Sequence, residues 1–243
     1  METTDFKVDD FDVLAIDWDY DYVVVRNQLW LIHDVASEEG IGEAQWHLPD
    51  EYDFSLAALG IEDPRDLHEL VIATMRNRGR ELPLVPGFVE CIAEINQAAE
   101  QAGKGVVHNV LTSRSRRQAE VTNAHINDLL PGIFNNVNLT GHVDPVPPEF
   151  PKWHHHARTA EDLVALGLKV AKMVVDDSPS TADSCVNIAG SNLGVVFGDY
   201  HWNRGKLPVV QPGPGAELRR IARAKDHPAL ARLTIGTFFR QAA

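Results

Sequence analysis

Short runs of apolar residues alternate along the chain with longer segments in which apolar residues recur at helical spacing. The runs predict buried strands at residues 13–16, 105–111, 133–139, 173–175 and 193–197. The longer segments predict helices at residues 88–102, 118–130, 160–166 and 182–189, and a C-terminal helix with the basic residues Arg219, Arg220, Arg223 and Lys225 on a solvated face. This alternation predicts an α/β fold, a Rossmann-like parallel sheet with helices on both faces.

A helical insert follows the first predicted strand. Residues 26–84 carry apolar residues at helical spacing, interrupted by turn signals such as Gly40 and Asp63-Pro64. We therefore predict two domains, a core formed by residues 1–25 and 85–243 and a small helical cap formed by residues 26–84.

The composition excludes several classes of partner. The 243 residues include 35 Asp and Glu against 22 Lys and Arg, a formal net charge of −13, and such an acidic chain is a poor candidate for binding nucleic acid or an anionic membrane. No apolar stretch approaches the ~18 residues of a membrane span, and the first residues lack a signal-peptide pattern. Cys91 and Cys185 alone form neither a disulfide framework nor a four-ligand zinc site. We expect a soluble cytoplasmic protein, and a homodimer is compatible with the sequence.

Polar side chains stand at the ends of the predicted strands, where a parallel sheet binds its ligands. They are Asp17 and Asp19, Thr112 and Ser113, Lys152 near the start of a later helix, and Asp176 and Asp177. Carboxylates gathered at one edge repel each other unless a cation joins them, and an oxygen-only site favours Mg²⁺. Hydroxyl groups before a helix and a lysine suit a phosphate group. The set predicts phosphoryl transfer with an aspartate as the covalent nucleophile.

The chain resembles the haloacid dehalogenase-like (HAD) hydrolase superfamily in the order of its motifs. These are an Asp-x-Asp after the first strand, "PLVPG" before a helix, "VVHNVLTSRS", a lysine, and "VVDDSP". The segment that begins at "DDSPSTADSC" is similar to the cytosolic-type 5′(3′)-nucleotidase branch. The resemblance implies an Mg²⁺-dependent phosphatase that acts on a small phosphorylated metabolite or a nucleotide.

The resemblance also implies roles for individual residues. Asp17 matches the nucleophile and Asp19 the general acid and base, and Asp176 matches the acidic metal ligand beside Asp17 and the backbone carbonyl of Asp19. Asp177 belongs to the outer shell of the metal. Thr112 and Lys152 match the phosphate-binding groups, with Ser113 beside them.

A shifted register of the first motif is the main alternative. Asp19 is then the nucleophile and Asp21 the acid, and this register fits Val23-Val24-Val25 better. Against it, Asp17 would lie inside the strand, where an unpaired buried carboxylate is costly. Three other functions stay open: a HAD-fold binding or regulatory protein with weak catalysis, a haloacid dehalogenase, and a phosphotransferase.

Two clusters of basic residues are better explained as surface features than as binding or metal sites. Arg114, Arg116 and Arg117 are typical of a solvated helix start. The residues His154, His155 and His156 cannot all face one ion from a helix, and we expect them on the surface or in a loop.

Overall fold

A single parallel sheet forms the centre of the molecule. The structure, a computed structural model, describes residues 8, 10–26, 64–141, 151–200, 203–205 and 207–239. Within these residues, six strands form a sheet in the order β3-β2-β1-β4-β5-β6, and every neighbouring pair is parallel. The strands are β1 (Val13–Trp18), β2 (Gly105–Ser115), β3 (Asn136–Gly141), β4 (Val170–Asp176), β5 (Leu193–Phe197) and β6 (Arg220–Ala224). The predicted α/β, Rossmann-like fold is confirmed.

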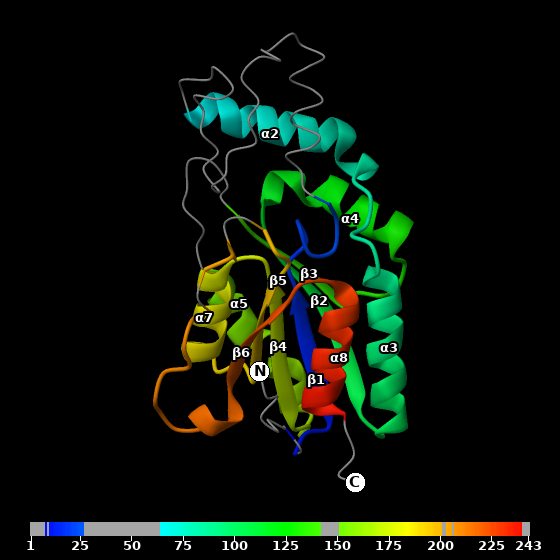
Figure 1. Cartoon of the computed structure of the whole chain (residues 1–243). Helices are drawn as coiled ribbons and strands as arrows, with labels where there is room; N and C mark the ends of the chain where they lie inside the picture. Colours follow the sequence, from blue (N-terminus) through cyan, green and yellow to red (C-terminus); the bar gives the residue numbers. More distant parts are fainter. Residues whose placement is uncertain are drawn as a thin grey trace.

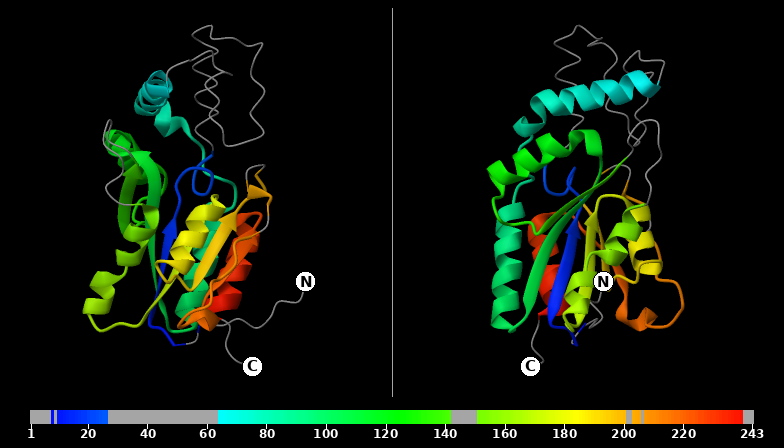
Figure 2. Two further views of the ribbon diagram at one scale, coloured as in Figure 1. Left: turned by 90° about the vertical axis from the view of Figure 1, so that its left-hand side faces the viewer. Right: turned by 180° about the vertical axis from the view of Figure 1, so that it is seen from behind.

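Helices cover both faces of this sheet. In the described part they are α2 (Pro64–Arg78), α3 (Phe88–Gln101), α4 (Ala119–Leu129), α5 (Lys152–Arg158), α6 (Glu161–Ala165), α7 (Pro179–Asn187) and α8 (His227–Phe238), with short 3₁₀ turns at η3 (Gly79–Glu81), η4 (Arg116–Gln118) and η6 (Ala216–Leu218). Helices α3 and α8 pack side by side, and α5 packs with α7 (Figure 1). Helix α2 lies beyond the carboxyl ends of the strands, above α4, in all the views of Figures 1 and 2.

The packing of α3 follows from its sequence. Its buried side chains recur at helical spacing and form one apolar stripe: Phe88, Cys91, Ile92, Ile95 and Ala99. The helix begins after Gly87, whose φ of 82° favours glycine. The Phe88 ring meets the Trp18 ring edge to face, with centroids 5.3 Å apart. This contact fixes α3 on the face of β1 to which Trp18 points.

The strand order reverses between the neighbouring strands β1 and β4. The chain passes from β1 to β2 in one direction and from β4 to β5 in the other, so the order reverses at these two neighbouring strands. Ligands of open α/β sheets bind at the carboxyl ends of the strands at such a point. Because side chains alternate along a strand, Asp17 faces α5 while Trp18 faces α3.

The structure corrects the predicted C-terminal helix. The basic run enters strand β6, which pairs with β5, and α8 begins only at His227. Alternation explains the strand: Ala222 and Ala224 are buried on one side, and Arg223 lies on the other. Arg223 is also not on a solvated face, because its guanidinium bonds to the backbone of Asn203.

The cap remains a prediction. Helix α2 and η3 lie within the predicted cap of residues 26–84, but residues 27–63 lie outside the described part of the chain. The position of α2 above the carboxyl edge of the sheet is the one a cap over the ends of β1 and β4 would take (Figure 1).

Candidate active site

Three buried carboxylates gather at the carboxyl ends of β1 and β4. Asp19 follows β1, Asp176 ends β4, and Asp177 comes next in the chain; oxygen atoms of the three lie within 4.8 Å of one another. The backbone N–H of Asp19 donates to the carbonyl of Val175 at 2.8 Å, so the ends of the two strands are joined directly. We call these three residues the acidic group.

Lys152 bridges two members of the acidic group. It is the first residue of α5, and its Nζ lies 2.9 Å from Oδ2 of Asp19 and 2.7 Å from Oδ2 of Asp176. Burial alone lowers the pKa of Lys152, but the carboxylates of Asp176 and Asp19 outweigh it and hold that pKa above its usual value. Lys152 therefore stays charged.

Burial and mutual repulsion disfavour the charged form of a carboxylate in the acidic group. Burial raises the pKa of Asp19 well above its ordinary value; Lys152 opposes this change, while Asp176 and Asp177 add to it. A hard divalent cation would offset the crowded charge, and an all-oxygen donor set is the one that Mg²⁺ prefers. The side chains of Asp19, Asp176 and Asp177 fit such an ion.

Asp17 lies elsewhere. Its carboxylate is fully buried within β1 and accepts three hydrogen bonds: from Asn109 Nδ2 at 3.0 Å, His156 Nδ1 at 2.7 Å and Thr159 Oγ1 at 3.1 Å. Among the described residues, the structure does not bring Asp17 into the acidic group. These donors satisfy the buried carboxylate, so the objection to the shifted register loses its force.

Helix α5 connects the two aspartates through one of its faces. Lys152, His156 and Thr159 are spaced at i, i+4 and i+7 and point toward the sheet, the first to Asp19 and the other two to Asp17. The expectation of a surface or loop position is wrong for His156, which is fully buried. The helical spacing of Lys152, His156 and Thr159 was the signal in the sequence that could have revealed the buried position of His156.

Asp21 is bound by a buried arginine. Nη2 of Arg114 donates to Oδ1 of Asp21 at 2.7 Å, and Nε donates to Oδ2 at 2.8 Å. The guanidinium also lies 4.5 Å from the centre of the Tyr20 ring. The interpretation of Arg114 as part of a solvated helix start is therefore wrong. A tight turn brings Asp21 to this position, since the carbonyl of Tyr20 accepts from the N–H groups of Val24 and Val25.

Ser113 and Thr112 have different surroundings. Ser113 is exposed and lines, with Lys152, a pocket of about 310 Å³. Its other lining residues are Thr140, Gly141, Pro151, Trp153, Ser180, Thr181 and Ser184. Thr112 is buried, and its hydroxyl accepts from the N–H of Arg114 at 3.2 Å. The structure thus brings Ser113 and Lys152 to one pocket.

Comparison with known proteins identifies the fold. No family model and no curated protein match the sequence. A HAD-family hydrolase from Deinococcus radiodurans, with bound phosphate and sodium, is 16% identical with a TM-score of 0.54, over 93% of this chain and 95% of that one. A HAD-superfamily hydrolase of subfamily IA from Geobacter sulfurreducens is 19% identical with a TM-score of 0.53, over 94% and 99%. The chain has the fold of HAD-family hydrolases.

The length and apolar character of the helices bear on whether any of them could span a membrane. In the part of the chain that the structure describes, none combines the length and apolar character needed to cross a membrane.

Proposed function

We propose that the protein hydrolyses small phosphate monoesters through a phosphorylated aspartate, with Mg²⁺ as its cofactor. The observation that carries the proposal is the convergence of Asp19, Asp176, Asp177 and Lys152 at the carboxyl ends of β1 and β4. The fold shared with HAD-family hydrolases supports it.

We assign the nucleophile to Asp19 rather than Asp17. Asp19 follows the end of its strand, within the acidic group and beside Lys152, whereas Asp17 lies inside β1 and outside that group. Donors inside the protein bind both aspartates, and those of Asp19 are Lys152 and the N–H of Tyr20. An oxygen of Asp19 attacks phosphorus, the bond to the alcohol oxygen breaks, and water then attacks the acyl phosphate to release inorganic phosphate. The ammonium of Lys152 stabilises the negative charge of the transferred group. Bound Mg²⁺ would neutralise charge on the phosphoryl oxygens and the carboxylates.

Asp21 is the residue we assign to proton exchange, two positions after the nucleophile. It would protonate the leaving oxygen and later accept a proton from the attacking water. Because Arg114 occupies both oxygens of Asp21, this role requires one of those hydrogen bonds to open. The ion pair of Arg114 with Asp21 also favours a second candidate function, because a bound Asp21 is hindered in proton exchange. This candidate is a binding protein with the same fold and little turnover.

The pocket beside Lys152 suggests the kind of substrate. Five hydroxyl side chains line it, from Ser113, Thr140, Ser180, Thr181 and Ser184, together with the Trp153 ring. No carboxylate is present among the described lining residues, and the carboxylates nearest to the Lys152 ammonium are its partners Asp19 and Asp176. We propose a small phosphorylated metabolite or a nucleotide as the substrate.

Removal of the metal tests the proposal. Purified protein is incubated with sugar phosphates, polyol phosphates and nucleoside monophosphates, and released phosphate is measured with Mg²⁺, with EDTA, and with EDTA followed by excess Mg²⁺. We expect turnover that falls at least about 100-fold in EDTA and returns with Mg²⁺, because the carboxylates repel both one another and the substrate without the ion. Full activity in EDTA contradicts the metal site. Binding of phosphate esters without release of phosphate favours the second candidate.

A further inference from the structure

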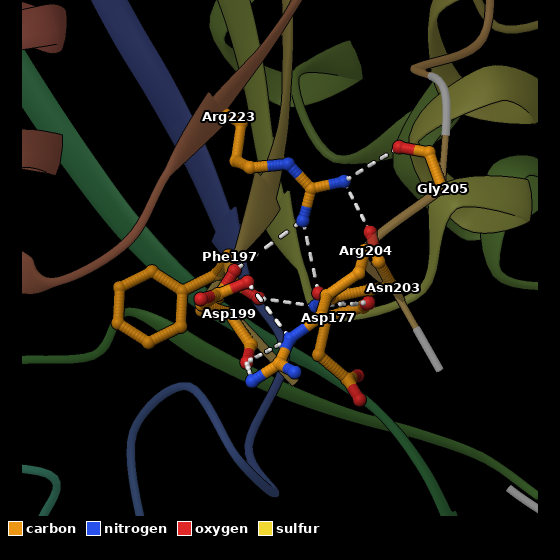
Figure 3. Close-up of polar contacts among 8 residues, drawn as sticks. Asp177, Phe197, Asp199, Asn203, Arg204, Gly205 and Arg223 are labelled. Atoms are coloured by element: carbon orange, nitrogen blue, oxygen red, sulfur yellow. Dashed lines mark hydrogen bonds and ion pairs between the residues drawn. The ribbon is translucent and has the colours of Figure 1, made fainter. Parts of the chain in front are cut away.

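A buried asparagine joins the ends of β4 and β5 next to the acidic group. Nδ2 of Asn203 donates to the backbone carbonyl of Asp177 at 3.1 Å and to that of Phe197 at 2.8 Å (Figure 3). Asn203 is fully buried, and these two bonds use both hydrogens of its amide. The side chain therefore fixes the chain that carries Asp177 to the last residue of β5.

Arg223 determines how the amide of Asn203 is turned. Nη1 of Arg223 donates to Oδ1 of Asn203 at 2.9 Å, and Nη2 donates to the Asn203 backbone carbonyl (Figure 3). A guanidinium can only donate, so the amide oxygen must face Arg223 and the NH₂ group must face the two carbonyls. Longer contacts of 3.4 Å reach the carbonyls of Gly198 and Gly205. Strand β6 thus supports the asparagine that holds Asp177.

We propose that Asn203, oriented by Arg223, is a positioning residue that sets Asp177 for binding the divalent cation. The inference rests on the proposed function, because it takes the acidic group to be the metal site. Asn203 is not one of the ligands in this proposal, because its NH₂ group is bound to two backbone carbonyls. It acts on the backbone of Asp177, whose position decides where the carboxylate can meet Asp19 and Asp176. Outer partners of metal ligands commonly change metal affinity by about 10–100-fold when removed.

Asn192, which is partly buried, provides a control at the opposite end of the strands. Its Oδ1 accepts from the N–H of Lys172 at 2.9 Å, and its Nδ2 donates to the carbonyl of Leu218 at 3.1 Å. It therefore ties β4 to the segment before β6, as Asn203 ties β4 to the end of β5. Lys172 lies four residues before Asp176 on the strand, about 13 Å away. Loss of Asn192 removes similar hydrogen bonds without touching the acidic group.

Calorimetric titration with Mg²⁺ tests the inference on the full chain. We expect Asn203→Ala to bind Mg²⁺ about tenfold more weakly than the unsubstituted protein. Asn192→Ala should lose less thermal stability, because Asn192 is only partly buried, and should bind Mg²⁺ normally. Arg223→Lys is the second variant, for use if Asn203→Ala does not fold; its single ammonium cannot reproduce the two-nitrogen contact, so its affinity should fall as well.

Each outcome has one meaning. Unchanged affinity in a folded Asn203→Ala or Arg223→Lys overturns the inference but leaves the proposed function standing. An equal loss of affinity in Asn192→Ala also overturns it, because the effect would then be general destabilisation. Failure of the unsubstituted protein to bind Mg²⁺ overturns both the inference and the metal site on which it rests.

Discussion

Replacement of Asp19 by asparagine abolishes phosphate release in our account, with a loss of at least about 1,000-fold in kcat, because the amide is not a nucleophile. The variant should fold at least as stably as the unsubstituted protein. Burial raises the pKa of Asp19, so ionisation of this group costs folding stability as pH rises toward that raised pKa, and asparagine has no charge to lose. Thermal unfolding of the metal-free proteins at neutral pH measures this directly.

Asp17→Asn is the matched comparison for Asp19→Asn. We expect it to lose stability and to keep most of its turnover, the reverse of the result for Asp19→Asn. Asp17 accepts hydrogen bonds from Asn109, His156 and Thr159, so an amide in its place meets donors and lowers the stability by about 1–3 kcal/mol. Turnover should stay within about tenfold, because the reacting atoms lie at Asp19. Loss of phosphate release in a folded Asp17→Asn, with activity kept in Asp19→Asn, would restore Asp17 as the nucleophile.

Replacement of Lys152 by methionine should lower both kcat and stability. Loss of a charge that stabilises the transferred group costs about 100–1,000-fold in kcat. In the metal-free protein, Asp19 and Asp176 also lose their buried partner, and we expect a loss of about 3–5 kcal/mol in the free energy of unfolding. Mg²⁺ should restore part of that stability, since it binds the folded carboxylates. Steady-state rates and urea unfolding with and without Mg²⁺ measure both effects.

Lys172→Met controls for the loss of a lysine near the sheet. Nζ of Lys172 donates to the carbonyl of Ala189 at 2.8 Å and is remote from the acidic group. Its replacement should leave kcat unchanged. If Lys152→Met keeps a normal kcat while Lys172→Met does not, the role assigned to Lys152 is wrong.

Most of the sheet was predictable because buried parallel strands are uninterrupted apolar runs. The predicted strand at residues 193–197 matches β5, and the predicted helix at residues 88–102 matches α3 to within one residue. Strand β6 was missed because its sequence, RIARA, contains two arginines and has no apolar run longer than two residues. Its strand structure comes from pairing with β5, which is a tertiary effect.

The candidate site was predictable only in part. Residues at the carboxyl ends of strands, such as Asp19 and Asp176, could be placed at one edge from topology alone. The surroundings of Asp17 could not be predicted, because its donors lie far along the chain: Asn109 on β2, His156 on α5 and Thr159 just after α5. Nor could the pairing of Arg114 with Asp21, since a local pattern does not show which cation a turn will bury.

The identity of the phosphorylated residue tests the central claim most directly. Protein turning over substrate with Mg²⁺ is quenched in acid, reduced with borohydride, which converts an aspartyl phosphate to homoserine, and sequenced by fragmentation mass spectrometry. Our account predicts homoserine at position 19. Homoserine at position 17 or 21, or at neither of these nor position 19 while phosphate is released, would contradict it.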